Sequence, residues 1–252
     1  AYKYGFHIIL HGNYFLGPYF LAGEKARQEK KNIDVNQVVK EQLVKENRAV
    51  ILSPSGDPQM YWGKVAPTLS HPQNIKDSCD FLRQNLEQIS DLPGLKAVAL
   101  DDEVGVSGLD FNGGGCGDYS PSSQDFFKKI TGLAPAPALH RPVGTVIKDD
   151  DPLLLYMEKA IGFSGMDSPI MQAYNLQLAE VVHKARPGLL ALQCPGAFRG
   201  ELDFVHYEVY SYPYGASPIG AAFQADLMLG IAGGKEKKPL IPLIGWFQGL
   251  PM

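Results

Sequence analysis

Cysteine, charge of one sign and long apolar runs are all scarce in this sequence. The three cysteines, Cys79, Cys116 and Cys194, are widely separated, which excludes a zinc ribbon and a CxxC redox pair, and their odd number argues against a disulfide scaffold. Lysine and arginine number 23 against 27 acidic residues, without a long basic run, so we expect no nucleic acid partner. No run reaches the about 18 apolar residues of a membrane span. A neutral or weakly polar ligand fits this balance better.

Alternating short and long apolar patterns predict the fold class. The 252 residues, 45% of them hydrophobic, are enough to bury a large core. Predicted strands cover residues 5–10, 49–53, 95–100, 189–193, 204–210 and 240–244; predicted helices cover residues 34–47, 72–90, 121–131, 168–186 and 216–232. Ser70 is expected to cap the second of these helices. The alternation predicts an α/β fold with parallel strands, and the length is about that of one (β/α)8 barrel of the TIM type.

The expected organisation is a single domain over residues 1–252 with a long loop insertion at about residues 104–187. Insertions after the carboxyl end of a strand commonly form binding loops in α/β proteins. The glycine-rich stretch 112–117 lies there, but no strand leads directly into it, which argues against a phosphate-binding loop. If residues 95–100 are strand four, the chain is expected to span strands two to seven, a barrel incomplete at its ends.

Three consecutive carboxylates, Asp101, Asp102 and Glu103, end the strand predicted over residues 95–100. Like charges placed so close together must face water, a cation or a ligand. They also separate one another's pKa values, so that one carboxyl is able to act as an acid while its neighbour stays charged. This acidic strand end is therefore the first candidate for a catalytic site.

Side chains alternate along a strand, which divides this one into two faces. Ala97 and Ala99 suit the crowded interior of a barrel, and Leu95, Asp101 and Glu103 have the same parity. Val98, Leu100 and Asp102 have the opposite parity, and the first two suit contact with helices. The pattern therefore predicts that Asp101 and Glu103 lie over the mouth of the barrel.

Two other interpretations of the acidic strand end are open. The carboxylates would stabilise a neighbouring helix N-terminus, or pair with Arg or Lys at the base of the loop. Asp101, Asp102 and Asp110 would also offer oxygen ligands to calcium, although their spacing is not that of an EF-hand.

Polar and aromatic residues recur near the other predicted strand ends: His11 and Asn13; His206, Glu208, Tyr210 and Tyr212; Trp246 and Gln248. The row around Tyr210 suits either a pocket wall or a solvated edge. Trp246 is placed either to stack on the apolar face of a sugar or to pack in the core. His7 and His11 share a face, but the sequence offers no third metal ligand, so we expect no metal.

The order of these motifs resembles β-galactosidase-like glycoside hydrolases of the (β/α)8 clan A. The resemblance rests on residues 100–105, on residues 119–132 with their aromatic-Ser-Pro start and Thr-Gly end, and on residues 203–213 and 238–246. It implies that Glu103 is the general acid/base at the end of strand four. A retaining enzyme of this clan also needs a nucleophilic carboxylate, about 5–5.5 Å away, from the end of strand seven. Gln248 is not a nucleophile, so either Glu208 or Asp101 serves, or the nucleophile lies elsewhere, or the chain is not a retaining hydrolase of this type.

A second resemblance is to substrate-assisted hexosaminidases and chitinase-like barrels. In them an acidic cluster ends strand four and a tyrosine lies near strand six. This resemblance implies that Asp101, Glu103 and Tyr210 act together with the substrate's own acetamido group.

The sequence thus predicts a cofactor-free glycoside hydrolase acting on an oligo- or polysaccharide by carboxylate acid/base catalysis. The catalytic candidates are Glu103, Asp101 and Glu208; the substrate-binding candidates are His11, Asn13, Asp102, Tyr210, Tyr212, Trp246 and Gln248. The alternatives are a catalytically silent carbohydrate-binding barrel, which Gln248 favours, and a hexosaminidase-like enzyme. The expected partners are a carbohydrate and further domains of a longer chain. A secreted or periplasmic location follows if the substrate is a polysaccharide.

Overall fold

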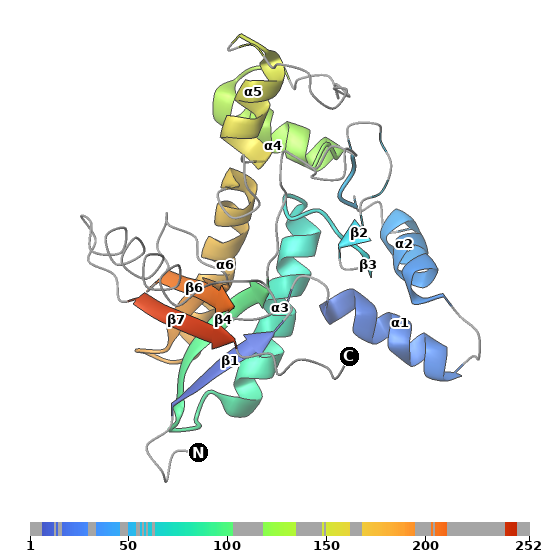
Figure 1. Cartoon of the computed structure of the whole chain (residues 1–252). Helices are drawn as coiled ribbons and strands as arrows, with labels where there is room; N and C mark the ends of the chain where they lie inside the picture. Colours follow the sequence, from blue (N-terminus) through green and yellow to red (C-terminus); the bar gives the residue numbers. More distant parts are fainter. Residues whose placement is uncertain are drawn as a thin grey trace, which may run out of the picture.

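The computed structural model describes residues 7–12, 14, 17–29, 34–45, 50–53, 56, 58, 60–61, 64–102, 118–134, 148, 150–161, 168–194, 203, 205–210 and 240–245 (Figure 1). The strands are β1 (Ile8–Gly12), β2 (Met60–Tyr61), β3 (Lys64–Val65), β4 (Leu95–Asp102), β5 (Leu190–Cys194), β6 (Val205–Tyr210) and β7 (Leu240–Gly245). The helices are α1 (Gly17–Glu29), α2 (Val35–Lys45), α3 (Pro72–Ile89), α4 (Pro121–Thr131), α5 (Pro152–Tyr156) with the π-helical turn η2 (Met157–Ile161), and α6 (Pro169–Ala185).

The centre of the fold is a parallel sheet in the order β1-β4-β5, in which β4 is hydrogen-bonded on both sides. β6 and β7 form a second parallel pair. Neighbouring parallel strands need a crossover connection between them, and α3 and α6 supply these crossovers before β4 and β5. The predicted α/β class with parallel strands is therefore confirmed.

The strand predicted over residues 49–53 is wrong. Val50 and Leu52 make only isolated antiparallel bridges, to Pro67 and Pro58, and the N–H of Ile51 donates to the carbonyl of Ala66. Proline offers no N–H, so a segment facing prolines does not extend a ladder. Val50 and Ile51 are buried although they do not belong to the sheet, so burial alone accounts for this apolar run.

The parallel sheet has fewer strands before β4 than the sequence predicts. Because β1 pairs directly with β4, no strand lies between them. Among the described strands, only β1 precedes β4 in the parallel sheet. If β4 is strand four, β1 is therefore strand three, and the expected start at strand two is wrong for the described part of the chain.

The predicted helices are confirmed where the structure describes them, as α2, α3, α4 and α6; the helix predicted over residues 216–232 lies outside the described residues. The expected cap at Ser70 is wrong by one residue. Pro72 opens α3, so His71 becomes the N-cap, and its ring accepts the N–H of Gln73 at 3.3 Å. Helices α1 and α5 were not predicted, because neither has a sustained run of apolar residues at helical spacing.

The two faces of β4 are separated as predicted, with one exception. Val98 and Leu100 belong to the main core beside α3 and α6, whereas Ala97 and Ala99 pack with Leu192 in a separate cluster. Leu95 is the exception, because its side chain packs in the main core and not with Ala97 and Ala99. The register of β1 against β4 shifts by one residue there, which reverses the alternation.

Helices α3 and α6 cover the same side of the sheet and contact each other. Arg186, just after α6, connects α6 to the turn between α3 and β4 and to the start of β4. Its guanidinium donates hydrogen bonds to the carbonyls of Ser90, Leu92 and Leu95. A smaller core of Tyr19, Val39, Leu43, Val50 and Val65 holds α1 and α2 together.

The connecting segments gather at one end of the sheet. Helices α3 and α6 run antiparallel to the strands that follow them, so they begin at the end where β4 finishes. Figure 1 shows α4 and α5 beside these helix starts. In parallel α/β folds this end carries the binding loops.

A core substitution tests this packing. Leu82 on α3 is 0% exposed in the main core. We expect Leu82→Ala to lower the free energy of unfolding by about 2–5 kcal/mol, because it leaves a cavity. Leu92→Ala, at a position 47% exposed, is the control and should change it by less than about 0.5 kcal/mol. Urea unfolding measures both; equal effects would contradict this packing.

Candidate functional site

The end of β4 lies between the ends of its two neighbours. Gly12 of β1 pairs with Leu100, and Cys194 of β5 pairs with Asp102. The central position of β4 therefore brings Asp101 and Asp102 to the middle of the carboxyl edge of the sheet.

A register shift interrupts β4 at this edge. Leu100 pairs with Gln193 and Asp102 with the next residue, Cys194, so Asp101 is the additional residue of a bulge. Bulges re-aim residues and occur often beside active sites. The alternation that places Asp101 and Glu103 with the alanines is regular only through Leu100, so their common face stays a prediction.

The remaining predicted site residues fall into two groups. Glu208 and Tyr210 occupy β6, where their backbones pair with Leu243 and Gly245 of β7. The other group lies outside the described residues: Glu103, Asn13, Tyr212, Trp246 and Gln248, together with Asp110 and the glycine-rich stretch 112–117.

β6 lies beside β5, although the two strands are not in one hydrogen-bonded sheet. Asp203 makes the connection, because its N–H donates to the carbonyl of Ala191 at 3.0 Å and its carboxylate accepts the N–H of Ala191 at 2.6 Å. The same carboxylate lies 2.8 Å from Nε2 of His183 on α6. The second parallel pair is thus attached to the edge of β5.

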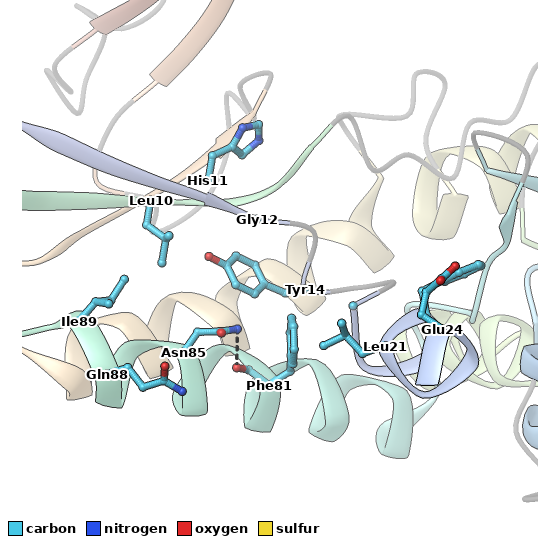
Figure 2. A pocket seen from close by; sticks show the side chains of 12 residues that line it. Leu10, His11, Gly12, Tyr14, Leu21, Glu24, Phe81, Asn85, Gln88 and Ile89 are labelled. Atoms are coloured by element: carbon cyan, nitrogen blue, oxygen red, sulfur yellow. Dashed lines mark hydrogen bonds between the residues drawn. The ribbon is translucent and has the colours of Figure 1, made fainter. Parts of the chain in front are cut away.

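His11 is exposed on β1 and pairs with Ala99. Figure 2 shows its ring on the opposite side of the strand from Leu10 and Tyr14, whose side chains face α3. His11 therefore lies on the alanine face, the predicted interior of the barrel, which agrees with a place near the carboxyl edge.

The cavity drawn in Figure 2 is lined in part by His11 and Gly12 at the end of β1. It has a volume of about 420 Å³ and lies between β1, α1 and α3, with Leu10, Tyr14, Phe81 and Ile89 among its walls. This is the helix side of the sheet.

A buried carboxylate, Asp118, was not predicted. Its side chain is 0% exposed. One oxygen accepts the N–H of Ser120 at 2.9 Å, and the other accepts hydroxyl hydrogen bonds from Ser123 at 2.7 Å and from Thr68. Burial raises the pKa of Asp118, and these donated hydrogen bonds oppose the rise.

Further hydroxyls surround this carboxylate. Ser70 Oγ lies 2.8 Å from both Thr68 Oγ1 and Ser123 Oγ, and Ser120 caps α4 by accepting the N–H of Ser123. We call Asp118, Thr68, Ser70, Ser120 and Ser123 the Asp118 cluster. The sequence signal that could have indicated this cluster is an aspartate two residues before a Ser-Pro helix start.

Aromatic residues contact the segment that carries Asp118. Tyr156 at the end of α5 donates its hydroxyl to the carbonyl of Asp118 at 2.7 Å, and its ring stacks on Tyr119 at 5.3 Å and meets Phe127 at 5.2 Å. Burial raises the pKa of Tyr156 well above its ordinary value, so its hydroxyl keeps its proton for this bond.

Within the described ranges, no group of three or more His, Cys, Asp or Glu side chains is placed to hold a metal ion. Of the described helices, none is both long and apolar enough to cross a bilayer.

No family model and no curated protein sequence matches this chain. Solved structures do match it. They include β-galactosidases from the psychrophilic Marinomonas ef1 (TM-score 0.54, 11% identity), from the Antarctic haloarchaeon Halorubrum lacusprofundi (0.53, 12%) and from Rahnella sp. R3 (0.54, 12%). The matches cover 90%, 88% and 93% of this chain but 42%, 41% and 40% of those chains. The chain thus spans less than half of each of these three proteins.

These matches, which extend to a GH42 β-galactosidase, show likeness to TIM-barrel glycoside hydrolases. The predicted resemblance is confirmed as a resemblance of fold. At 10–12% identity it does not extend to activity.

The raised pKa of Asp118 predicts a pH dependence of stability. The folded protein holds this proton more tightly than the unfolded chain does, so the free energy of unfolding falls as the pH rises above about 4, until the folded pKa is passed. An asparagine side chain does not titrate, so the advantage of wild type over Asp118→Asn should shrink as the pH rises. Urea unfolding at a series of pH values measures this difference; Asp91→Asn, at an exposed turn, is the control. A constant difference would contradict the raised pKa.

Proposed function

We propose that this chain forms the catalytic part of a barrel glycoside hydrolase acting on an oligo- or polysaccharide. The observation that carries the proposal is the position of Asp101 and Asp102 at the end of the central strand β4. In a parallel α/β fold, that edge is where reactive groups collect. The structural likeness to β-galactosidases supports sugar chemistry at this edge.

Glu103 follows directly after β4 and is assigned the role of proton donor. The leaving sugar is a poor leaving group as an alkoxide, so protonation of the glycosidic oxygen lowers the barrier to bond cleavage. The neighbouring charges of Asp101 and Asp102 favour the protonated form of Glu103, which is the form a general acid needs.

Asp101 or Glu208 is assigned as the second carboxylate. A nucleophile requires a separation of about 5–5.5 Å between the two carboxyl groups, and activation of water requires about 6.5–9.5 Å. Glu208 comes from β6, which is attached to β5 through Asp203, so this residue belongs to a strand near β4. The distance between the two carboxyl groups in a sugar complex decides between retention and inversion of the anomeric configuration.

The sugar would be bound by residues from several strand ends. Tyr210, Tyr212 and Trp246 are assigned to stacking on sugar faces. His11, Asn13, Asp102 and Gln248 are assigned to hydrogen bonds with hydroxyl groups. A polysaccharide substrate would favour a secreted or periplasmic location.

Further strands would complete the barrel. On the alanine face, Ile9 is 40% and Leu190 is 36% exposed, whereas a closed barrel covers such side chains. Within the described residues, β1 pairs only with β4. The proposal therefore includes additional strands supplied by a longer chain.

A catalytically silent carbohydrate-binding barrel is the second candidate. The sequence feature that favours it is Gln248, which the resemblance to the clan would place at the position of the strand-seven acid. A glycan array read beside release of reducing sugar separates the two candidates. Binding without release, across β-galactosides, β-glucosides and N-acetylhexosaminides, would favour the silent barrel.

Glu103→Gln tests the assigned proton donor. The amide keeps the size of the side chain but does not deliver a proton, so kcat should fall by about 10²–10⁴-fold. Glu87→Gln, on the exposed side of α3, is the matched control and should leave kcat unchanged. Initial rates on a glycoside that the wild type hydrolyses measure both. An unchanged rate for Glu103→Gln, with the fold intact, would refute the assignment.

A further inference from the structure

Asp203 joins three elements of the fold. Its main-chain N–H donates to the carbonyl of Ala191 on β5 at 3.0 Å, and its carboxylate accepts the N–H of the same alanine at 2.6 Å. The carboxylate also lies 2.8 Å from Nε2 of His183, in the last turn of α6. Two residues after Asp203, Val205 begins β6. One residue therefore connects β5, α6 and β6 near the amino end of β5.

This connection takes the place of a strand ladder. In a regular parallel ladder, a residue in the position of Ala191 bonds through both its N–H and its carbonyl to main-chain groups of the next strand. Here the main chain of Asp203 supplies one of these partners, and its carboxylate supplies the other. Ala191 is 0% exposed, so its N–H would be buried and unsatisfied without this carboxylate.

The β6–β7 pair needs such an anchor. Within the described residues, β6 forms its ladder with β7 only, and β5 forms its ladder with β4 only. A pair of strands is marginally stable by itself, and without shared hydrogen bonds its register against a neighbour is not fixed. A slip of one residue would move β6 by about 3.3 Å and exchange its two faces. The contacts of Asp203 oppose such a slip, because they involve both its main chain and its side chain.

We propose that Asp203 is a positioning residue: it anchors β6 to β5 and α6, and so sets the register of the β6–β7 pair and the position of Glu208 along the sheet. Glu208 lies three residues after the start of β6, about 10 Å along the strand. The anchor does not depend on the proposed function, but its effect on catalysis rests on that function, in which Glu208 is a candidate for the second carboxylate. A carboxylate suits an anchor, because hydrogen bonds to a charged acceptor are shorter and stronger than those to a neutral one.

Amide hydrogen exchange tests the anchor without any substrate. Asp203→Ala removes the acceptor of the Ala191 N–H and the partner of His183, so peptides from residues 205–210 and 240–245 should exchange at least about tenfold faster, while peptides from β1 and α3 keep their rates. Asp203→Asn keeps an oxygen for the N–H of Ala191 and should restore slow exchange in large part. His183→Ala leaves both contacts with Ala191 intact, so it should give a smaller increase, and it covers the case in which Asp203→Ala does not fold.

Asp80→Ala is the matched control. The side chain of Asp80 is 33% exposed, against 27% for Asp203, and it also contacts two groups, Lys76 and Arg83. All three residues lie on α3, so this variant should leave exchange in β6 and β7 unchanged. Wild-type exchange rates in Asp203→Ala, or in His183→Ala where Asp203→Ala does not fold, would overturn the anchor.

A double-mutant cycle tests the effect on catalysis. If Asp203 acts through Glu208, then Asp203→Ala should lower kcat by about tenfold or more in the wild-type background but by less than about twofold in the Glu208→Gln background. The rates are measured on a glycoside that the wild type hydrolyses. An equal loss in both backgrounds would mean a general effect on the fold and would overturn the positioning of Glu208, as would no loss in either. If the wild type hydrolyses no glycoside, the proposed function fails, and the exchange rates alone decide whether Asp203 anchors β6.

Discussion

The structure depends on the parallel pairing of β4 with a neighbour on each side. A parallel strand cannot reach its neighbour through a tight turn, so each pairing requires a helix to return the chain. α3 and α6 provide these returns, and both pack on the side of β4 that carries Val98 and Leu100. The small residues Ala97 and Ala99 remain on the other side, with Leu192. The location of the acidic edge follows from the same pairing, because a central strand ends between the ends of its neighbours.

Polar contacts at that edge complement the apolar core. The core beneath the sheet consists mainly of aliphatic and aromatic side chains, whose burial holds the helices against the sheet but is not directional. Asp118 makes directional contacts with hydroxyls and backbone groups from separate segments. Such a network is stable only when its members are satisfied, because each buried polar group left unpaired would destabilise the fold. The segment that leads into α4 is thus tied to the residues that precede α3.

The comparisons bear on function only through this architecture. Likeness to β-galactosidases at 10–12% identity extends over most of the chain. It identifies the kind of scaffold on which the acidic edge is presented. Catalysis depends on the separation of individual carboxyl groups, to which a shared scaffold is largely insensitive. The roles of Glu103, Asp101 and Glu208 therefore rest on chemical argument from their positions in the sequence and on the strands.

Local sequence patterns suffice to predict the class of fold, most of the helices that the structure describes and the central acidic strand. These features arise from local periodicity: the apolar positions of α3 and α6 repeat at helical spacing, and the run that forms β4 ends in charge. Tertiary structure alone decided which apolar runs pair. Residues 50–53 have the composition of a strand, yet Val50 and Leu52 bridge only to prolines, and Val50 and Ile51 are buried without joining the sheet. It also decided the register shifts near Leu95 and Asp101, and the gathering of Thr68, Ser123 and Tyr156 around Asp118. Pairing, register and such clusters join residues far apart in the chain, and the energies that select them come from neighbours that local patterns do not contain.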